Sequence, residues 1–310
     1  MTPTPVLEAV LPSERADADP RALAALARQA EDLGYAAVWL PDHLLPPGPY
    51  GPVYGGVHEP LVTLGYLAAV THRIRLGTSV LVLPMRSPFV VAKQAATLQQ
   101  LSAGRLVLGV GIGWDRAEFA AVGADFERRA ARTDEALRLL RHLTEGGDGP
   151  FEGEFHGYER GVFAPHPAPR LHLMTGGTSA PALRRAARYA DSWQAFALTP
   201  PEFADRAARL RELAGARRVA ATTRIAWTDA RTTAAEARAF GAAGAAAVAV
   251  HFGPDDGGYG ERMTALAREW SAGVLTAPNR PRASPGWPLK PAGTGLTCFS
   301  AARGARRGMR

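Results

Sequence analysis

The chain has 310 residues, of which 46% are hydrophobic and 21% charged, a composition typical of a globular protein with a sizeable core. This excludes wholesale disorder. The formal net charge of +7 is concentrated after residue 270, where seven basic residues and no acidic ones leave 29 basic (36 minus 7) against 29 acidic residues before them. The preceding part is therefore formally neutral and offers no basic stripe for a phosphate backbone, so we expect no nucleic-acid partner.

Cysteine use and apolar run lengths indicate the compartment. The single cysteine, Cys298, rules out a disulfide framework, which favours a reducing cytoplasm. No run approaches the roughly 18 apolar residues that a membrane span needs, and Met1–Glu14 lacks the pattern of a signal peptide. We expect a cytoplasmic protein without a membrane partner.

Along the chain, short apolar runs alternate with segments of helical periodicity. Runs without polar alternation are typical of strands buried on both faces. Eight such runs are predicted: Val6–Leu11, Ala36–Leu40, Ile74–Leu83, Arg105–Val110, Leu171–Met174, Ser192–Leu198, Val219–Trp227 and Ala246–Phe252. Helical stripes between them include one at residues 23–33 that ends at Gly34. Eight alternations predict a single (β/α)₈ (TIM) barrel over residues 1–270, whereas a doubly wound sheet fits this count less well.

Two segments depart from the alternation. Thr144–Arg170 is rich in Gly, Pro and aromatic residues, and it is predicted to be an inserted hairpin or ordered loop. Residues 271–310 carry five prolines and no acids, with no periodicity, which predicts a disordered basic tail.

The candidate catalytic residues follow the second predicted strand. In a (β/α)₈ barrel, functional groups lie at the carboxyl ends of strands, and Asp42-His43 occupies this position. A histidine can exchange a proton near neutrality, and an adjacent carboxylate can orient it. The alternative is that His43 only caps a strand end. The loop that follows contains Tyr50 and Tyr54, which with Trp114 are candidates for a partly aromatic substrate pocket.

Glycine-rich turns follow the third, fourth and fifth strands. Gly77 precedes Thr78, Ser79 and Val80, where a flat ring could approach the backbone or a β-bulge could serve packing alone. After the fourth strand, a run with glycine at positions 109, 111 and 113 differs from a dinucleotide fingerprint in spacing and place, and it favours room for a planar cofactor.

The fifth strand ends in a turn that suits an anion. Gly176-Gly177-Thr178-Ser179 opens a predicted helix, so backbone N–H groups and two hydroxyls could receive a phosphate. The alternative is an ordinary helix cap by Thr178 or Ser179.

Other chemistries lack their motifs. The eight histidines are scattered without metal-ligand spacing, so we expect no metal. No GxSxG elbow and no GxxxxGK[ST] loop is present, which argues against serine hydrolases and P-loop enzymes.

Taken together, these motifs resemble the bacterial luciferase-like superfamily, and in particular its branch of oxidoreductases that depend on the deazaflavin coenzyme F420. The resemblance covers about residues 6 to 270. It rests on an ordered series of motifs: Gly34-Tyr35, Val38–His43, Ala68–Thr71, Ile74–Thr78, Pro84–Pro88, Leu101–Arg105, Gly109–Trp114 with Glu118 and Gly123, Gly176–Ser179 and Ala190–Trp193.

The resemblance implies a (β/α)₈ barrel, usually a homodimer, that holds a reduced flavin or deazaflavin in its mouth. Asp42 and His43 would line the ring, and Ser79-Val80 would form a bulge behind it, often with a non-prolyl cis peptide. The remaining contacts would come from Gly109, Gly111 and Gly113 beside the cofactor, and from Gly176, Gly177, Thr178 and Ser179 at its phosphate.

One departure from the family pattern bears on the substrate. Sugar-phosphate dehydrogenases of this branch have a catalytic Glu directly after the last glycine of the fourth-strand loop, whereas this chain has Trp114, so that activity is not expected. The leading hypothesis is an oxidoreductase that transfers a hydride between F420 and a small organic substrate, with His43 as proton partner. The alternatives are an FMN-dependent monooxygenase and a non-catalytic flavin- or deazaflavin-binding protein.

Overall fold

A computed structural model describes residues 4–13, 15, 17–46, 48, 56–147, 149–253 and 256–275. In this part of the chain the strands are β1 (Val6–Val10), β2 (Ala37–Leu40), β3 (Arg75–Thr78), β4 (Leu81–Val82), β5 (Leu106–Gly111), β6 (His172–Gly176), β7 (Ser192–Phe196), β8 (Ala220–Ala226) and β9 (Ala247–His251). The helices are α1 (Pro20–Asp32), α2 (Pro60–Val70), the 3₁₀ turn η1 (Leu83–Met85), α3 (Pro88–Leu101), α4 (Arg116–Ala121), α5 (Arg129–Thr144), α6 (Ala180–Tyr189), α7 (Pro200–Ala214), α8 (Ala230–Ala242) and α9 (Tyr259–Leu275).

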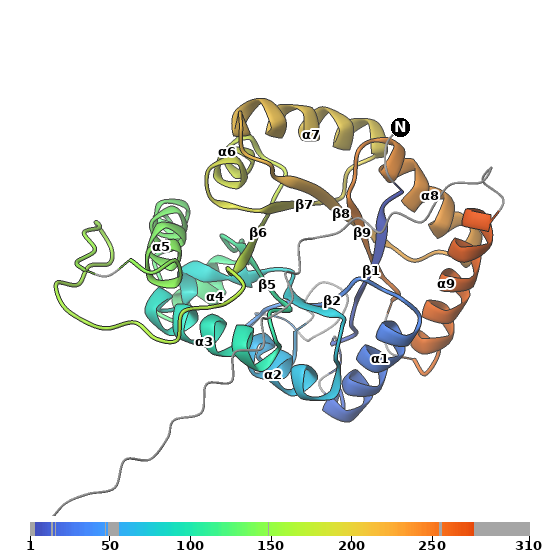
Figure 1. The fold of residues 1–310 in the computed structure, drawn as a ribbon, viewed down its shortest axis with the longest axis horizontal. Coiled ribbons are helices and arrows are strands. Elements are labelled where there is room, and N and C mark those ends of the chain that lie inside the picture. The colour runs from blue at the N-terminus through green and yellow to red at the C-terminus, as the bar shows by residue number, and fades with distance from the viewer. Residues whose placement is uncertain are drawn as a thin grey trace, which may run out of the picture.

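The strands close into a parallel barrel surrounded by helices (Figure 1). The hydrogen-bonded order runs β3-β2-β1-β9-β8-β7-β6-β5-β4, and an additional β3–β5 pairing closes the ring. All strand pairs are parallel, which confirms the predicted (β/α)₈ barrel.

The third barrel strand differs from the prediction. The sequence predicts one strand over Ile74–Leu83, but the structure has two short strands, β3 and β4, that both pair with β5. The chain between them contains a cis peptide bond at Ser79-Val80, as the family resemblance implies. The backbone therefore bulges at the carboxyl end of this strand, at the barrel mouth.

Two apolar clusters lie on opposite faces of the barrel wall. The larger cluster packs strands against helices and includes Val38 and Leu106, whereas a smaller one contains their sequence neighbours Ala37, Trp39 and Val107. Because successive side chains of a strand point to opposite faces, the smaller cluster fills the barrel interior. Its remaining members are Val10, Met174 and Ala249, with Val80 packed against them.

The predicted segment boundaries are partly revised. The helix α9 continues to Leu275, so it extends past the predicted boundary at residue 270, and the tail from residue 276 lies outside the described residues. The 144–170 segment contains an isolated antiparallel bridge between Phe151 and Tyr158, and the Glu135 carboxylate accepts hydrogen bonds from three of its backbone N–H groups. No helix in the described part of the chain is long and apolar enough to cross a membrane.

Candidate active site at the barrel mouth

A histidine–glutamate pair lies at the mouth of the barrel. His43 follows β2, and its Nδ1 lies 3.0 Å from Oε2 of Glu118 on α4. The side chains are 11% and 3% exposed. The other carboxylate oxygen of Glu118 accepts the backbone N–H groups of Leu44 and Leu45 at 2.5 and 3.0 Å. Since a carboxylate accepts at Nδ1, that nitrogen carries a proton, and exchange with a substrate would pass through Nε2.

Asp42 has a different role from the one that its position beside His43 suggests. Its buried carboxylate accepts a hydrogen bond from the Val82 backbone N–H at 2.8 Å and one from the Arg86 guanidinium at 2.5 Å. These contacts tie the end of β2 to β4 and η1. The carboxylate that orients His43 is therefore Glu118, and Asp42 fixes the loops around the pair.

Glu118 belongs to one of the motifs that resemble the family, but the sequence alone indicates no role for it. One signal could have found it. Asp115 caps α4 by accepting the Glu118 N–H, so Glu118 lies in the first turn of a short helix directly after the glycine-rich loop. An acid at this place is close to the mouth in any (β/α)₈ barrel.

The glycines of the mouth make room for neighbouring protein atoms, and their contact with a cofactor stays a prediction. A Cβ on Gly77 would lie 2.3 Å from the Trp39 ring, and one on Gly109 would lie 2.0 Å from the Thr78 carbonyl oxygen. A Cβ on Gly111 would lie 2.5 Å from a methyl group of Val80. Gly113 is likewise enclosed by Val82 and Phe119.

Thr78 joins neighbouring strands below the mouth. Its hydroxyl donates to the Gly109 carbonyl at 2.6 Å and accepts the Gly109 N–H at 3.0 Å. Because Thr78 is fully buried in these contacts, it supports the bulge from behind. A direct contact between its hydroxyl and a ligand is therefore not expected.

The bulge brings Ser79 and Val80 to the seventh strand. Ser79 Oγ donates to Oε1 of Gln194 on β7 at 2.6 Å, and the Gln194 amide nitrogen is buried without a hydrogen-bond partner. Val80 is half-buried and lies against both Gly111 and Gly176. The sequence alone does not single out Gln194, whose only signal is an amide side chain in a predicted strand that is apolar apart from Gln194 and Ser192.

The turn between β6 and α6 keeps backbone donors open. In the described part of the chain, the N–H groups of Gly177, Thr178 and Ser179 donate to no protein acceptor. Ser179 caps α6 by accepting the Ala182 N–H at 3.4 Å, as the alternative interpretation predicts. The Trp193 indole donates to the Gly177 carbonyl at 2.7 Å and fixes the turn. Gly177 has a φ of +106°, which favours glycine.

Aromatic side chains stand at the rim of the mouth. Trp114 is 56% exposed, and its ring makes an edge contact with His43 at 6.0 Å between centroids. Phe196 at the end of β7 is 64% exposed and lies 5.7 Å below the Arg224 guanidinium. Tyr50 and Tyr54 lie outside the described residues.

The opposite end of the barrel interior holds a cluster of buried titratable side chains. Glu8, Arg75 and His172 line a cavity of about 190 Å³ together with Ser192 and Trp39. Burial raises the pKa of Glu8 to about 7, although the Trp39 N–H and the Arg75 charge act in the opposite direction. Burial and the Arg75 charge lower the pKa of His172 to about 3. This cluster lies at the amino-terminal ends of the strands and is remote from His43 in the topology.

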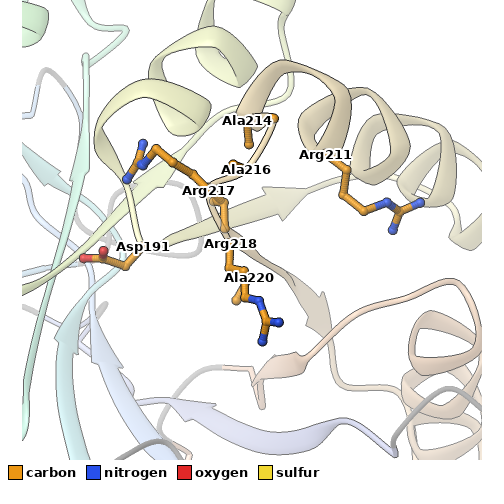
Figure 2. Close-up of a pocket in the computed structure, with 9 residues that line it drawn as sticks. Asp191, Arg211, Ala214, Ala216, Arg217, Arg218 and Ala220 are labelled. Carbon is orange, nitrogen blue, oxygen red and sulfur yellow. The ribbon is translucent and has the colours of Figure 1, made fainter.

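A larger cavity of about 530 Å³ lies on the same amino-terminal side, between α7 and β8 (Figure 2). The polar groups of this cavity either contact other protein groups or point away from one another. Arg217 donates to the carbonyls of Ala187 and Ala190, and Asp191 pairs with Arg141 and Arg170. Arg211, Arg217 and Arg218 point in different directions in Figure 2, so they do not converge on a ligand.

Metal-binding groups do not cluster here. Among the described residues, no three His, Cys, Asp or Glu side chains are placed so that they could hold a metal ion.

The arrangement defines a class of protein: a (β/α)₈ barrel whose mouth combines a histidine–glutamate pair, a half-buried valine and backbone N–H groups without a protein acceptor. A family profile described as luciferase-like monooxygenase matches residues 3–278. The chain belongs to this family.

Comparisons with individual proteins agree with this family. The chain is 36% identical over 206 residues to an uncharacterised protein of Mycobacterium tuberculosis, a match that spans 61% of this chain and 71% of the relative. It is 41% identical over 141 residues to the F420-dependent glucose-6-phosphate dehydrogenase of Kineococcus radiotolerans, spanning 44% of this chain and 41% of that relative.

Solved structures show the same fold. An F420-dependent secondary alcohol dehydrogenase in complex with an F420–acetone adduct superimposes with a TM-score of 0.75, at 18% identity over 87% of this chain and 99% of the other. The coenzyme F420-dependent tetrahydromethanopterin reductase of Methanopyrus kandleri gives a TM-score of 0.66 at 17% identity, with the same coverage.

Proposed function

We propose that this protein is an oxidoreductase that transfers a hydride between coenzyme F420 and a small organic substrate. The observation that carries the proposal is the His43–Glu118 pair at the same mouth as the open donors of the β6–α6 turn. The similarity to F420-dependent relatives supports this cofactor.

The residues of the mouth fit a deazaflavin with a phosphate-bearing tail. The half-buried face of Val80 provides an apolar floor, and the Gln194 amide nitrogen supplies an unsatisfied polar group at its edge. The backbone donors of residues 177–179 and the amino-terminal end of α6 suit a phosphate. When bound, the deazaflavin would supply two-electron hydride chemistry.

The side chains of this protein would position the reactants and move the proton. Glu118 holds the His43 ring through Nδ1, and Nε2 would exchange a proton with a substrate oxygen or nitrogen. Trp114 packs against the His43 ring, where it would exclude water and border the substrate. We infer that the substrate is not a sugar phosphate, because Trp114 occupies the position of the catalytic Glu in that subgroup.

The test is a cofactor comparison with the purified protein. We expect binding of F420 in preference to FMN, and hydride transfer between F420 and members of a panel of small alcohols, carbonyl compounds and enones, followed by deazaflavin absorbance. Tight binding of FMN with substrate-dependent oxygen consumption would instead support a monooxygenase. F420 binding without turnover of any substrate would favour a non-catalytic binding protein.

We also propose that two copies associate through α2 and α3. Helix α2 contains no charged residue and exposes Val62 and Tyr66, and α3 exposes Val90 and Leu101 on the adjoining surface. Val62 and Leu101 line one groove between the two helices, and exposed apolar side chains gathered in this way are typical of an interface. Sedimentation should give twice the chain mass, and Val62→Asp should yield monomers. A monomeric wild-type protein would refute this assembly.

A further inference from the structure

We infer that Gln194 recognises the deazaflavin ring itself, by donating a hydrogen bond from Nε2 to a carbonyl oxygen on the pyrimidine edge of the ring, and that Ser79 fixes the amide for this contact. The inference rests on the proposed function and names the side chain that forms a hydrogen bond with the ring. No other polar side chain of the bulge and β7 combines such burial with an unused donor.

The strand register places Gln194 inside the barrel. Gln194 pairs with Gly176 on one side and with Thr222 on the other. Two residues before it on β7, Ser192 lines the interior cavity, so Gln194 faces the same way one layer nearer the mouth. Its neighbour Trp193 faces outward and stacks on Phe203.

The hydrogen bond from Ser79 sets the orientation of the amide. The side chain is 5% exposed, and Oε1 accepts the Ser79 hydroxyl at 2.6 Å. The Nε2 group is consequently turned away from Ser79, and it is buried without an acceptor. A buried amide donor without a partner is destabilising, so its retention here favours an acceptor supplied by a ligand.

The surroundings of Gln194 suit a flat ring. Gly111 and Gly176 contribute no side chains to this layer, and Val80 lies against both of them. An aromatic ring placed over Val80 would lie beside Gly176, whose partner on β7 is Gln194, so one edge of the ring would lie near this amide. The pyrimidine edge of a deazaflavin carries two carbonyl oxygens on either side of an N–H, so it offers the acceptor that Nε2 lacks.

The test measures dissociation constants by deazaflavin fluorescence for two ligands: F420, and a bare deazaflavin riboside analogue without phosphate or glutamyl groups. Gln194→Leu should raise the dissociation constants of both ligands by the same factor, about 5- to 100-fold, because a carbonyl oxygen of the bound ring would lose its hydrogen bond in a buried site. Ser79→Ala should weaken both by a smaller factor, because the amide loses its fixed orientation.

Thr223→Val is the matched control, since it removes a buried hydroxyl from β8 on the outward face and should change neither constant. Thermal melting of each variant checks that it is folded. Ser79→Ala carries the test where Gln194→Leu fails to fold. Wild-type affinity for the bare ring in both Gln194→Leu and Ser79→Ala would overturn the inference while leaving the proposed cofactor intact. A wild-type protein that binds neither ligand would overturn the proposed function instead.

Discussion

Replacing Glu8 with Gln should make the protein more stable at alkaline pH. Glu8 is buried inside the barrel, where its Oε2 accepts the Trp39 indole N–H at 2.9 Å. Burial raises its pKa from 4.5 to about 7 against the smaller effects of Trp39 and Arg75. The native state therefore binds this proton more tightly than the unfolded state, and stability falls as the pH rises from about 4.5 to about 7.

The magnitude follows from the change in pKa. Each unit corresponds to about 1.4 kcal/mol, so ionising Glu8 in the folded protein costs about 3 kcal/mol. A glutamine keeps the oxygen that accepts the Trp39 N–H but never ionises. At pH 8 Glu8→Gln should therefore raise the free energy of unfolding by up to about 3 kcal/mol, or the melting temperature by roughly 6–12 °C.

The assay is urea denaturation of the wild-type protein and the variant at pH 5, 6, 7 and 8. The gain should be largest at pH 8 and shrink toward pH 5, and it would approach zero only below the unfolded-state pKa of 4.5, where Glu8 is protonated in both states. The lowered pKa of His172 makes stability fall as the pH decreases, which is the opposite direction, but this effect is the same in the wild-type protein and the variant and cancels in their difference. Exposed Glu159→Gln is the control. A loss of stability in Glu8→Gln at pH 8 would show that the Glu8 charge stabilises the fold through Arg75.

Three further changes test the mouth. His43→Ala should lower the rate of single-turnover hydride transfer by about 10²–10⁴-fold at saturating F420. Glu118→Gln should lower it less, because the imidazole ring of His43 remains and only its carboxylate partner is lost. Wild-type rates in both variants would exclude the pair from the chemistry. Thr178→Asp should weaken F420 binding at least about tenfold, whereas uncharged Thr178→Asn should not, as judged by fluorescence titration; equal losses would argue against a phosphate there. Gly109→Ala should lower the free energy of unfolding in urea by about 1–3 kcal/mol or more, because its Cβ would lie 2.0 Å from the Thr78 carbonyl oxygen. In the control Gly161→Ala the Cβ meets nothing within 4 Å, and similar urea midpoints for the two variants would refute this packing.

The barrel could be predicted because most strands are buried on both faces and are therefore mainly apolar runs without polar alternation. The predicted first strand, Val6–Leu11, differs from β1 by a single residue. For the third strand, residue types offered a bulge at Ser79-Val80 as one possibility and the family resemblance implied it, but neither showed that the strand divides into β3 and β4 there. This division depends on Gly109 and Gly111, two strand positions on β5 that accept the displaced backbone and the Val80 side chain.

The site was predicted as a set of loops, and its decisive contacts were not. Barrel topology places every strand end at one mouth, so Asp42, His43 and the 176–179 turn were identified by position alone. The partner of His43 lies 75 residues along the chain, and the nearest carboxylate in sequence, Asp42, is held by Arg86 instead. Which of the two acids contacts His43 and which contacts Arg86 depends on the geometry of the folded chain, and spacing along the sequence does not specify it.

The two ends of the barrel interior should respond independently to mutation. The apolar layer of Trp39, Val107 and Met174 lies inside the barrel between the Glu8 cluster and the bulge at the mouth. Because these side chains are uncharged and packed together, the loss of charge at Glu8 should have little effect on the structure of the mouth. Gln194 in turn has no charge that would alter the pKa of Glu8. Glu8→Gln should therefore change the pH dependence of unfolding without changing the dissociation constant of F420, whereas Gln194→Leu should do the reverse. A shift of F420 affinity in Glu8→Gln at pH 8 would show that the charge cluster reaches the cofactor site through this layer.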